Sequence, residues 1–135
     1  MGSVGQVHQV FDFLLHGPQE LLSSRLTLSY SERHPLQVNV AFGAAVTSDG
    51  RMAVWVIGRD LLALGLHDPT GQGDVRVRPA GDRIAIEFHD GPDYALITVP
   101  RDALTQFLNS TFAVVPLGHE SQCTDWHEEL AALLA

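Results

Sequence analysis

The sequence predicts an α+β fold in a single domain that covers residues 1–135. A chain of 135 residues has the usual size of one domain. Hydrophobic residues make up 45% of it, which is enough for a core at a size where folding buries roughly two thirds of the unfolded surface. Most segments alternate apolar and polar residues between short turns, as antiparallel strands do. We expect about seven antiparallel strands in two sheets, with two to three short helices, in the order ββββαβββαα.

The first half of the chain predicts four strands. They are expected at residues 6–15, 24–31, 35–44 and 52–58. The first strand is rich in β-branched, aromatic and aliphatic side chains and ends before Gly17-Pro18. The second and third alternate, so one face of each is expected to be buried: Leu26, Leu28, Tyr30, Leu36, Val38, Val40 and Phe42. The triplet Ser48-Asp49-Gly50 predicts a hairpin turn before the fourth strand.

The second half predicts a different pattern, in which helices flank three more strands. The helices are expected at residues 60–66, 101–110 and 124–134, and the strands at 74–79, 83–89 and 94–100. Gly65 stands where the first helix can end in a left-handed turn, and Pro100 suits the first turn of the second helix. Thr124 or Asp125 can cap the third helix. Its apolar face would consist of Trp126, Leu130, Leu133 and Leu134.

The charge of the chain favours a protein partner. All eight cationic residues are arginines, and the net charge is −8. The absence of lysine excludes Schiff-base chemistry, a covalent pyridoxal site and the lysine of a phosphate-binding P-loop. An acidic chain is also poorly suited to bind a nucleic-acid backbone or anionic lipid. We therefore expect partners that are proteins.

Several features point to a cytoplasmic protein without membrane insertion. No apolar run approaches the ~20 residues of a membrane-spanning helix, and the first residues lack the pattern of a signal peptide. The single cysteine, Cys123, cannot form an internal disulfide. No motif indicates a cofactor, and no nucleophile motif stands out, so we expect the protein not to be an enzyme.

Residues 58–79 gather the polar side chains that could form a binding loop. The candidate partner-binding residues are Arg59, Asp60, His67, Asp68, Thr70, Asp74, Arg76 and Arg78. Each also has a structural explanation, which we favour: Asp60 suits the first turn of a helix, and Pro69 to Gly71 turn the chain. Because loops on rigid scaffolds often carry binding, we expect a structural segment with an edge that contacts a partner.

Two further clusters allow alternative functions. Arg76, Arg78 and Arg83 can share one sheet face and form an anion patch, although ordinary solvent-facing decoration explains them better. His119, Cys123, His127 and Glu128 could ligate a metal and support a small metal-dependent enzyme. Their spacing matches no common zinc motif, and a lone cysteine is usually a small buried hydrophobe. We therefore expect no metal site.

One part of this pattern resembles a known family. It comprises Arg59 to Leu62, Gly65 to His67, Pro69, Gly71, Gly73 to Val77 and Pro79. These residues resemble the central signature of the SsgA-like proteins, which are small actinobacterial regulators of sporulation-specific cell division. The likeness extends more loosely over almost the whole chain. Arg78 departs from the family pattern, which has an aromatic residue before the proline.

The resemblance implies both a fold and a role. The implied fold is similar to that of the plant whirly proteins, and it assembles into homo-oligomers, here a trimer. The implied role is non-enzymatic and located at division septa, where the protein would position or recruit the tubulin-like division protein FtsZ with an SsgA-like helper. The fold alone also suggests an alternative, single-stranded nucleic-acid binding. That alternative predicts salt-dependent binding through Arg76, Arg78 and Arg83.

Overall fold

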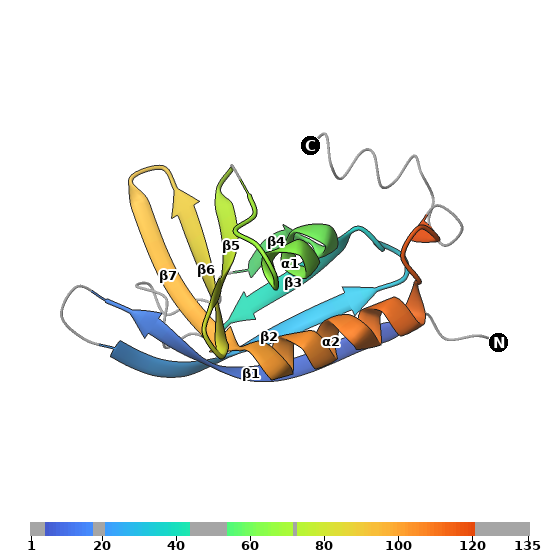
Figure 1. Cartoon of the computed structure of the whole chain (residues 1–135), viewed down its shortest axis with the longest axis horizontal. Coiled ribbons are helices and arrows are strands. Elements are labelled where there is room, and N and C mark those ends of the chain that lie inside the picture. The colour runs from blue at the N-terminus through green and yellow to red at the C-terminus, as the bar shows by residue number, and fades with distance from the viewer. Residues whose placement is uncertain (1–4, 18–20, 44–53, 72, 121–135) are drawn as a thin grey trace.

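Seven strands and two helices make up the described part of the chain (Figure 1). The computed structural model describes residues 5–17, 21–43, 54–71 and 73–120. The strands are β1 (Gln6–His16), β2 (Leu21–Ser31), β3 (Gln37–Phe42), β4 (Val54–Gly58), β5 (Val75–Ala80), β6 (Arg83–Asp90) and β7 (Asp93–Pro100). The helices are α1 (Arg59–Gly65) and α2 (Arg101–Val114). This confirms the predicted class and order as far as Glu120, whereas the turn at 48–50 and the helix at 124–134 lie outside the described residues.

Alternation along the strands produces one buried face, as predicted. In β2 and β3 the buried side chains are every second residue, from Leu26 to Tyr30 and from Val38 to Phe42. In β1 the buried positions are Phe11 and Phe13. Their rings meet those of other elements edge to face, for example Phe11 with Phe107 of α2 at 6.1 Å between centroids. The sheet is therefore built around one apolar core.

The strands form one continuous sheet, so the expected division into two sheets is not confirmed. The strand order is β4-β3-β2-β1-β7-β6-β5, and every pairing is antiparallel. The join between the halves is short: only Leu14 and Leu15 of β1 pair with Thr98 and Ile97 of β7. Strand β1 also pairs with β2 over its full length, so Leu14 and Leu15 have β2 on one side and β7 on the other. This sharing links the β1–β4 and β5–β7 parts.

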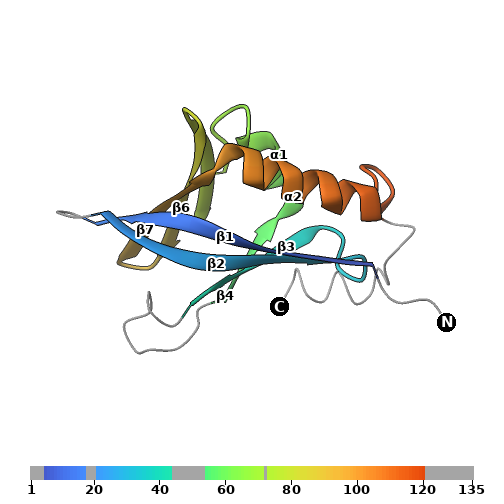
Figure 2. The same ribbon diagram turned by 90° about the horizontal axis from the view of Figure 1, so that it is seen from below.

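Both helices cover the same side of the β1–β4 part (Figure 2). Helix α2 begins directly after β7 and buries Leu104, Phe107 and Leu108 against the sheet. Helix α1 follows β4 and buries Leu62. No helix in the described residues is long and apolar enough to cross a membrane.

Gly65 has a different role from the predicted one. Its φ angle is not positive, and Leu66 continues in right-handed helical geometry, so the helix does not end in a left-handed turn. Instead, Gly65 lies against β5, where an added Cβ would come within 2.6 Å of the Val77 Cβ. The glycine is required because helix and strand approach each other closely.

Candidate partner-binding surface

The segment after α1 returns to the sheet and covers the edge of β5. Thr70 and Val77 exchange two backbone hydrogen bonds, with N–O distances of 2.8 and 2.9 Å. The Thr70 hydroxyl donates to the Asp68 carbonyl at 2.7 Å, which closes the turn before this contact. An edge strand with free backbone groups can pair with other chains, and the Thr70 contact blocks part of this one. Pro79 in the same strand has no backbone N–H, so it cannot donate a hydrogen bond to another strand at this edge.

Gly71 allows the segment to approach β5. Its φ angle is +113°, in the region that favours glycine, and an added Cβ would lie 2.5 Å from the Val75 carbonyl oxygen. Any side chain here would push the segment away from the strand. The glycine predicted as a turn residue is therefore also a close-approach residue.

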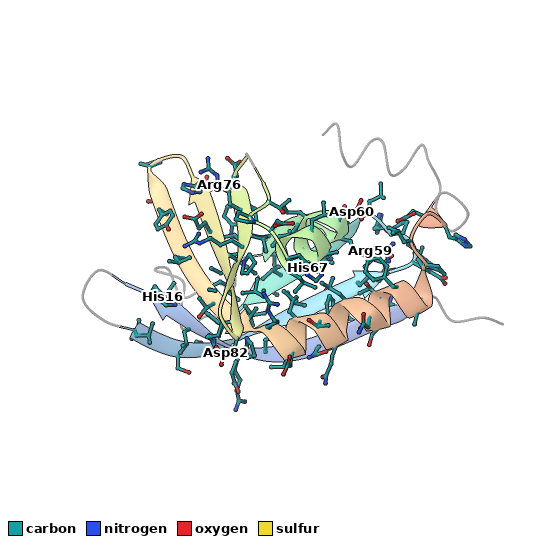
Figure 3. All side chains as sticks on the ribbon, viewed as in Figure 1. His16, Arg59, Asp60, His67, Arg76 and Asp82 are labelled. Carbon is teal, nitrogen blue, oxygen red and sulfur yellow. The ribbon has the colours of Figure 1, made fainter. Side chains whose placement is uncertain are left out.

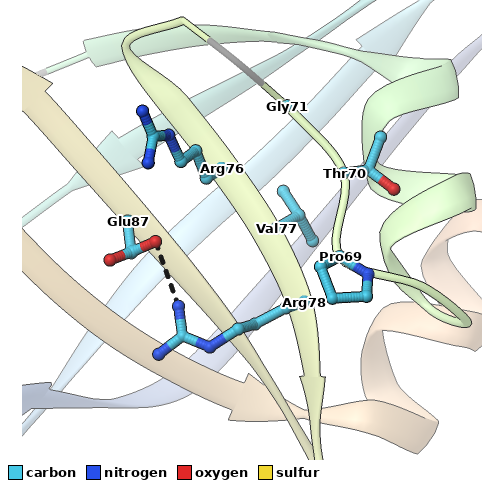
Figure 4. Close-up of a pocket in the computed structure, with 7 residues that line it drawn as sticks. All are labelled: Pro69, Thr70, Gly71, Arg76, Val77, Arg78 and Glu87. Carbon is cyan, nitrogen blue, oxygen red and sulfur yellow. Dashed lines mark ion pairs between the residues drawn. The ribbon is translucent and has the colours of Figure 1, made fainter.

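A pocket of about 280 Å³ lies between this segment and the outer side of β5 and β6 (Figure 4). It is lined by Pro69, Thr70, Gly71, Arg76, Val77, Arg78 and Glu87. The strand pattern places Arg76 and Arg78 on the side of β5 that faces away from the core, because Val77 between them is buried. The two arginines predicted as partner contacts therefore lie together.

The charges around the pocket are only partly compensated. Glu87 forms an ion pair with Arg78 at 3.0 Å and accepts a hydrogen bond from the Tyr94 hydroxyl at 2.9 Å. Arg76 stands directly opposite Glu87 in the β5–β6 register, yet it is exposed and has no ion pair within the described residues. A guanidinium without an internal partner can bind a carboxylate of another molecule with two hydrogen bonds.

Burial raises the pKa of Tyr94 above its usual value of 10.0, and the hydrogen bond to Glu87 and the charge of Glu87 act in the same direction. The nearby positive charge of Arg78 partly opposes this rise. The Tyr94 hydroxyl therefore stays protonated at neutral pH and donates to Glu87. Glu87 and Tyr94 were not among the predicted residues, although strand alternation puts both on the outer side with Arg76.

Arg59, expected at the partner-binding surface, is buried in the fold. Only 1% of it is exposed, so a partner cannot reach it. Its guanidinium donates to the carbonyl oxygens of Val115 at 2.7 Å and Thr111 at 3.3 Å, at the end of α2 (Figure 3). It also donates to the Glu120 carboxylate at 2.9 Å and lies 4.2 Å from the Phe112 ring centroid. Helix α2 has no basic residue in its own last turn, and Arg59 supplies the positive charge there.

The remaining candidates are dispersed over the segment. Asp60 and His67 are exposed at opposite ends of α1, and neither lines the pocket. Asp68 and Asp74 are exposed. They lie close in sequence to residues that line the pocket but do not line it themselves. Arg83 lies on the same sheet side as Arg76 and Arg78 but donates two hydrogen bonds of 2.8 Å to Thr98. Of the three arginines in the expected patch, Arg76 is therefore the one without an ion pair or side-chain hydrogen bond to the residues that the structure describes.

A metal site finds no support in the residues that the structure describes. Within 5–17, 21–43, 54–71 and 73–120, no three His, Cys, Asp or Glu side chains group as ligands. Of the candidate set around Cys123, only His119 lies in these ranges, and the other members are outside them.

Comparison with known proteins places this fold among division proteins. A family model described as "Streptomyces sporulation and cell division protein, SsgA" matches residues 25–120. A sporulation-specific cell division protein SsgB from Salinispora tropica is 37% identical over 118 residues, covering 84% of this chain and 82% of its own. The SsgB of Streptomyces coelicolor is 40% identical over 114 residues, covering 80% of each. The crystal structure of an SsgA-like protein from Thermobifida fusca covers 98% of both chains with a TM-score of 0.82 and 27% identity.

Proposed function

Because this chain belongs to the SsgA family of sporulation and cell division proteins, we propose that it is a non-enzymatic adaptor in sporulation-specific cell division. In this proposal it helps to position or recruit the FtsZ division machinery at septum sites, with an SsgA-like protein as a helper. The observation that carries the proposal is the agreement with proteins named SsgB in sequence and fold over most of the chain. One of these, a structure from work on SsgB mutations and longitudinal division in Streptomyces coelicolor, has a TM-score of 0.80 and 34% identity.

The proposed contact surface is the pocket beside β5. Arg76 is exposed, carries no internal ion pair within the described chain and is one of the residues that line the pocket. Its natural ligand is an acidic side chain, which a protein partner can present. The chain has a net charge of −8, so a local cation gives an acidic partner one favoured orientation. Loop and strand are joined by the Thr70–Val77 hydrogen bonds, which keep this surface in a fixed shape.

The adaptor is proposed to act as a homo-oligomer, a trimer in its simplest form. Several copies of one surface raise the avidity for a polymer without strong single contacts, because the second contact becomes intramolecular. Light scattering on the purified protein tests this step. A trimer at micromolar concentration is the expected result, and a strict monomer would remove the multivalent mechanism.

Co-sedimentation with polymers of purified FtsZ from the same organism tests the adaptor function. The wild-type protein is expected to pellet with the polymers, alone or after addition of the SsgA-like helper. Arg76→Glu is expected to weaken this association about tenfold, which corresponds to about 1.4 kcal/mol. Arg25→Glu is the matched control, because Arg25 is also an exposed strand arginine, lies in β2 away from the pocket-lining residues, and its replacement changes the net charge equally. The control should pellet like the wild type.

The same experiment distinguishes the nucleic-acid alternative. Pellets are compared with and without nuclease treatment of every component. Association that survives nuclease supports the adaptor, whereas association that disappears points to binding through nucleic acid. Failure to pellet with and without the helper would contradict recruitment of FtsZ.

A further inference from the structure

The two edges of the sheet are protected differently. Strands β4 and β5 are the outermost strands. On β5, the N–H and C=O of Val77 are both bonded to Thr70, and Pro79 has no N–H. Proteins commonly block their edge strands in such ways, because free backbone groups pair with other chains. The β5 edge is therefore closed to a further strand.

The ladder between β3 and β4 determines which backbone groups of β4 are free. The Arg59 N–H donates to the Leu36 carbonyl oxygen at 2.9 Å and continues this ladder beyond β4. Hydrogen bonding alternates along an antiparallel pair, so every second residue before Arg59 bonds to β3. The residues between them, Val54 and Val56, direct their N–H and C=O groups away from β3. No hydrogen bond reaches these groups from residues 5–17, 21–43, 54–71 or 73–120.

The side chains at the same two positions are apolar and exposed, 62% for Val54 and 54% for Val56. Ile57 is buried, so alternation places both valines on the opposite face of β4. Helices α1 and α2 cover the other face of the β1–β4 part (Figure 2). Gly58 is the N-cap of α1, which leaves the stretch from Val54 to Val56 as the open part of the edge.

The distribution of charge favours a second copy of this chain as the occupant. Strands β3 and β4 contain no Asp, Glu or Arg, whereas each of the other five strands contains at least one. The chain has a net charge of −8, so two copies repel each other over most of their surface. At the β4 edge two copies can approach without placing like charges opposite each other.

We propose that β4 pairs antiparallel with β4 of a second copy, with Val54 of each copy opposite Val56 of the other. Each of these residues then uses both of its free backbone groups, which gives four N–H···O bonds about a two-fold axis. The four valine side chains meet on one face of the joined sheets. Because the β5 edge is closed, the pairing ends at two copies and does not grow into a fibre.

The contact is small, so the pairing is reversible. Stable interfaces bury about 800 Å² on each partner, and a three-residue stretch buries much less. We expect a dissociation constant of roughly 0.1–1 mM. Such a contact becomes significant where many copies are concentrated along one polymer. This last consequence depends on the proposed adaptor function, whereas the pairing itself does not.

Amide exchange with water, measured by NMR on the full-length protein, tests the pairing directly. Spectra are compared at about 0.05 mM and about 1 mM. Mass action predicts that the Val54 and Val56 amides exchange about two- to threefold more slowly at the higher concentration. The Ile57 amide, which faces β3, should be unaffected. Sedimentation at the same concentrations should show reversible doubling of the mass found in dilute solution, whether that unit is a monomer or the proposed trimer.

Val56→Pro is the variant that blocks the edge. It removes an N–H that does not serve the β3 ladder, as Pro79 does at the other edge of the sheet. The concentration dependence of the mass and of Val54 exchange should disappear. Val56→Thr is the matched control, because it keeps the N–H and a β-branched side chain, and it should associate like the wild type. Val10→Lys adds a charge on the same face in β1, away from the edge, and should also leave the pairing intact.

Several results would overturn the proposal. Slow exchange of Val54 and Val56 in dilute solution would show that the edge is covered within the chain itself. Exchange and mass that do not depend on concentration would exclude the pairing, and growth beyond twice the mass would exclude a two-fold contact. Association that survives Val56→Pro, or that Val10→Lys abolishes, would assign the contact to the face of the sheet. If Val56→Pro does not fold, the wild-type exchange measurement decides.

Discussion

The Arg59 guanidinium and the Glu120 carboxylate are joined at 2.9 Å although 61 residues separate them in sequence. The same guanidinium binds the Thr111 and Val115 carbonyl oxygens at the end of α2. One arginine therefore neutralises the negative end of α2, satisfies carbonyl groups that the helix leaves open and fixes the connector that follows it. Tyr30 and Phe112 contact the guanidinium carbon at 5.0 and 4.2 Å from their ring centroids.

Replacement of Arg59 is expected to destabilise the fold strongly. Arg59→Met keeps the apolar stem but leaves Glu120 without its cation and two carbonyl groups with fewer partners. Loss of one member of a buried ion pair lowers the free energy of unfolding by about 3 kcal/mol. Urea unfolding measures the effect. Arg25→Met is the control, since its exposed pair with Asp12 contributes at most about 1 kcal/mol. Equal effects of the two changes would contradict the role assigned to Arg59.

Stability is expected to fall at acidic pH partly through Glu120. Burial alone would raise the pKa of Glu120, but hydrogen bonds from backbone N–H groups and from Arg59, with the charge of Arg59, hold it below the usual 4.5. A carboxyl whose pKa is lower in the folded state contributes stability above the unfolded value and loses it as the pH falls through the folded value. Wild type should therefore exceed Glu120→Gln in stability at pH 7. The difference should shrink below about pH 4.5. A difference that is independent of pH would exclude this contribution.

Gly65→Ala is expected to destabilise the protein by about 1–3 kcal/mol, because the new methyl group overlaps Val77. Gly73→Ala is the matched control, since its added Cβ meets no atom within 4 Å in the described part of the chain, apart from its neighbours in sequence. Val77→Ala removes the nearest atom, Cγ1, and keeps Cβ, so it should relieve part of the clash. The double variant Gly65→Ala/Val77→Ala is therefore expected to be more stable than the sum of the single changes predicts. Additive effects would show that helix and strand do not meet at these residues.

Glu87→Gln is expected to lower the pKa of Tyr94 toward 10.0, because it removes a negative charge beside the phenol and weakens its acceptor. Absorbance titration resolves the change, since the chain has two tyrosines and Tyr30 is buried. Asp93→Asn, a loss of the same charge at the first residue of β7, is the control. An unchanged titration curve in Glu87→Gln would contradict the Glu87–Tyr94 contact.

Much of the fold could be predicted from local patterns. Alternation identified β2 and β3 and their buried faces, because a half-buried strand imposes a period of two on its sequence. The single sheet could not be predicted in this way. It depends on two residues of β1 that pair with β7, and pairing between strands distant in sequence leaves no local signal.

The candidate surface could be predicted only in part, because local patterns show in the sequence and contacts between distant residues do not. Arg76 and Arg78 were placed together because they alternate within one strand. Arginine is usually found at the surface. The burial of Arg59 follows from two carbonyl groups at the end of α2, on Thr111 and Val115, which lie 52 and 56 residues away in sequence. Its position directly after Gly58, as the first residue of α1, gives no indication of these partners.

Deletion of the gene in its own host tests the role in sporulation-specific division most directly. The account predicts that vegetative growth continues while sporulation septa, counted by membrane staining along the cells, are lost. Wild-type protein and Arg25→Glu should restore the septa, and Arg76→Glu should restore them poorly at equal protein levels. Normal septation in the deletion strain would contradict the account.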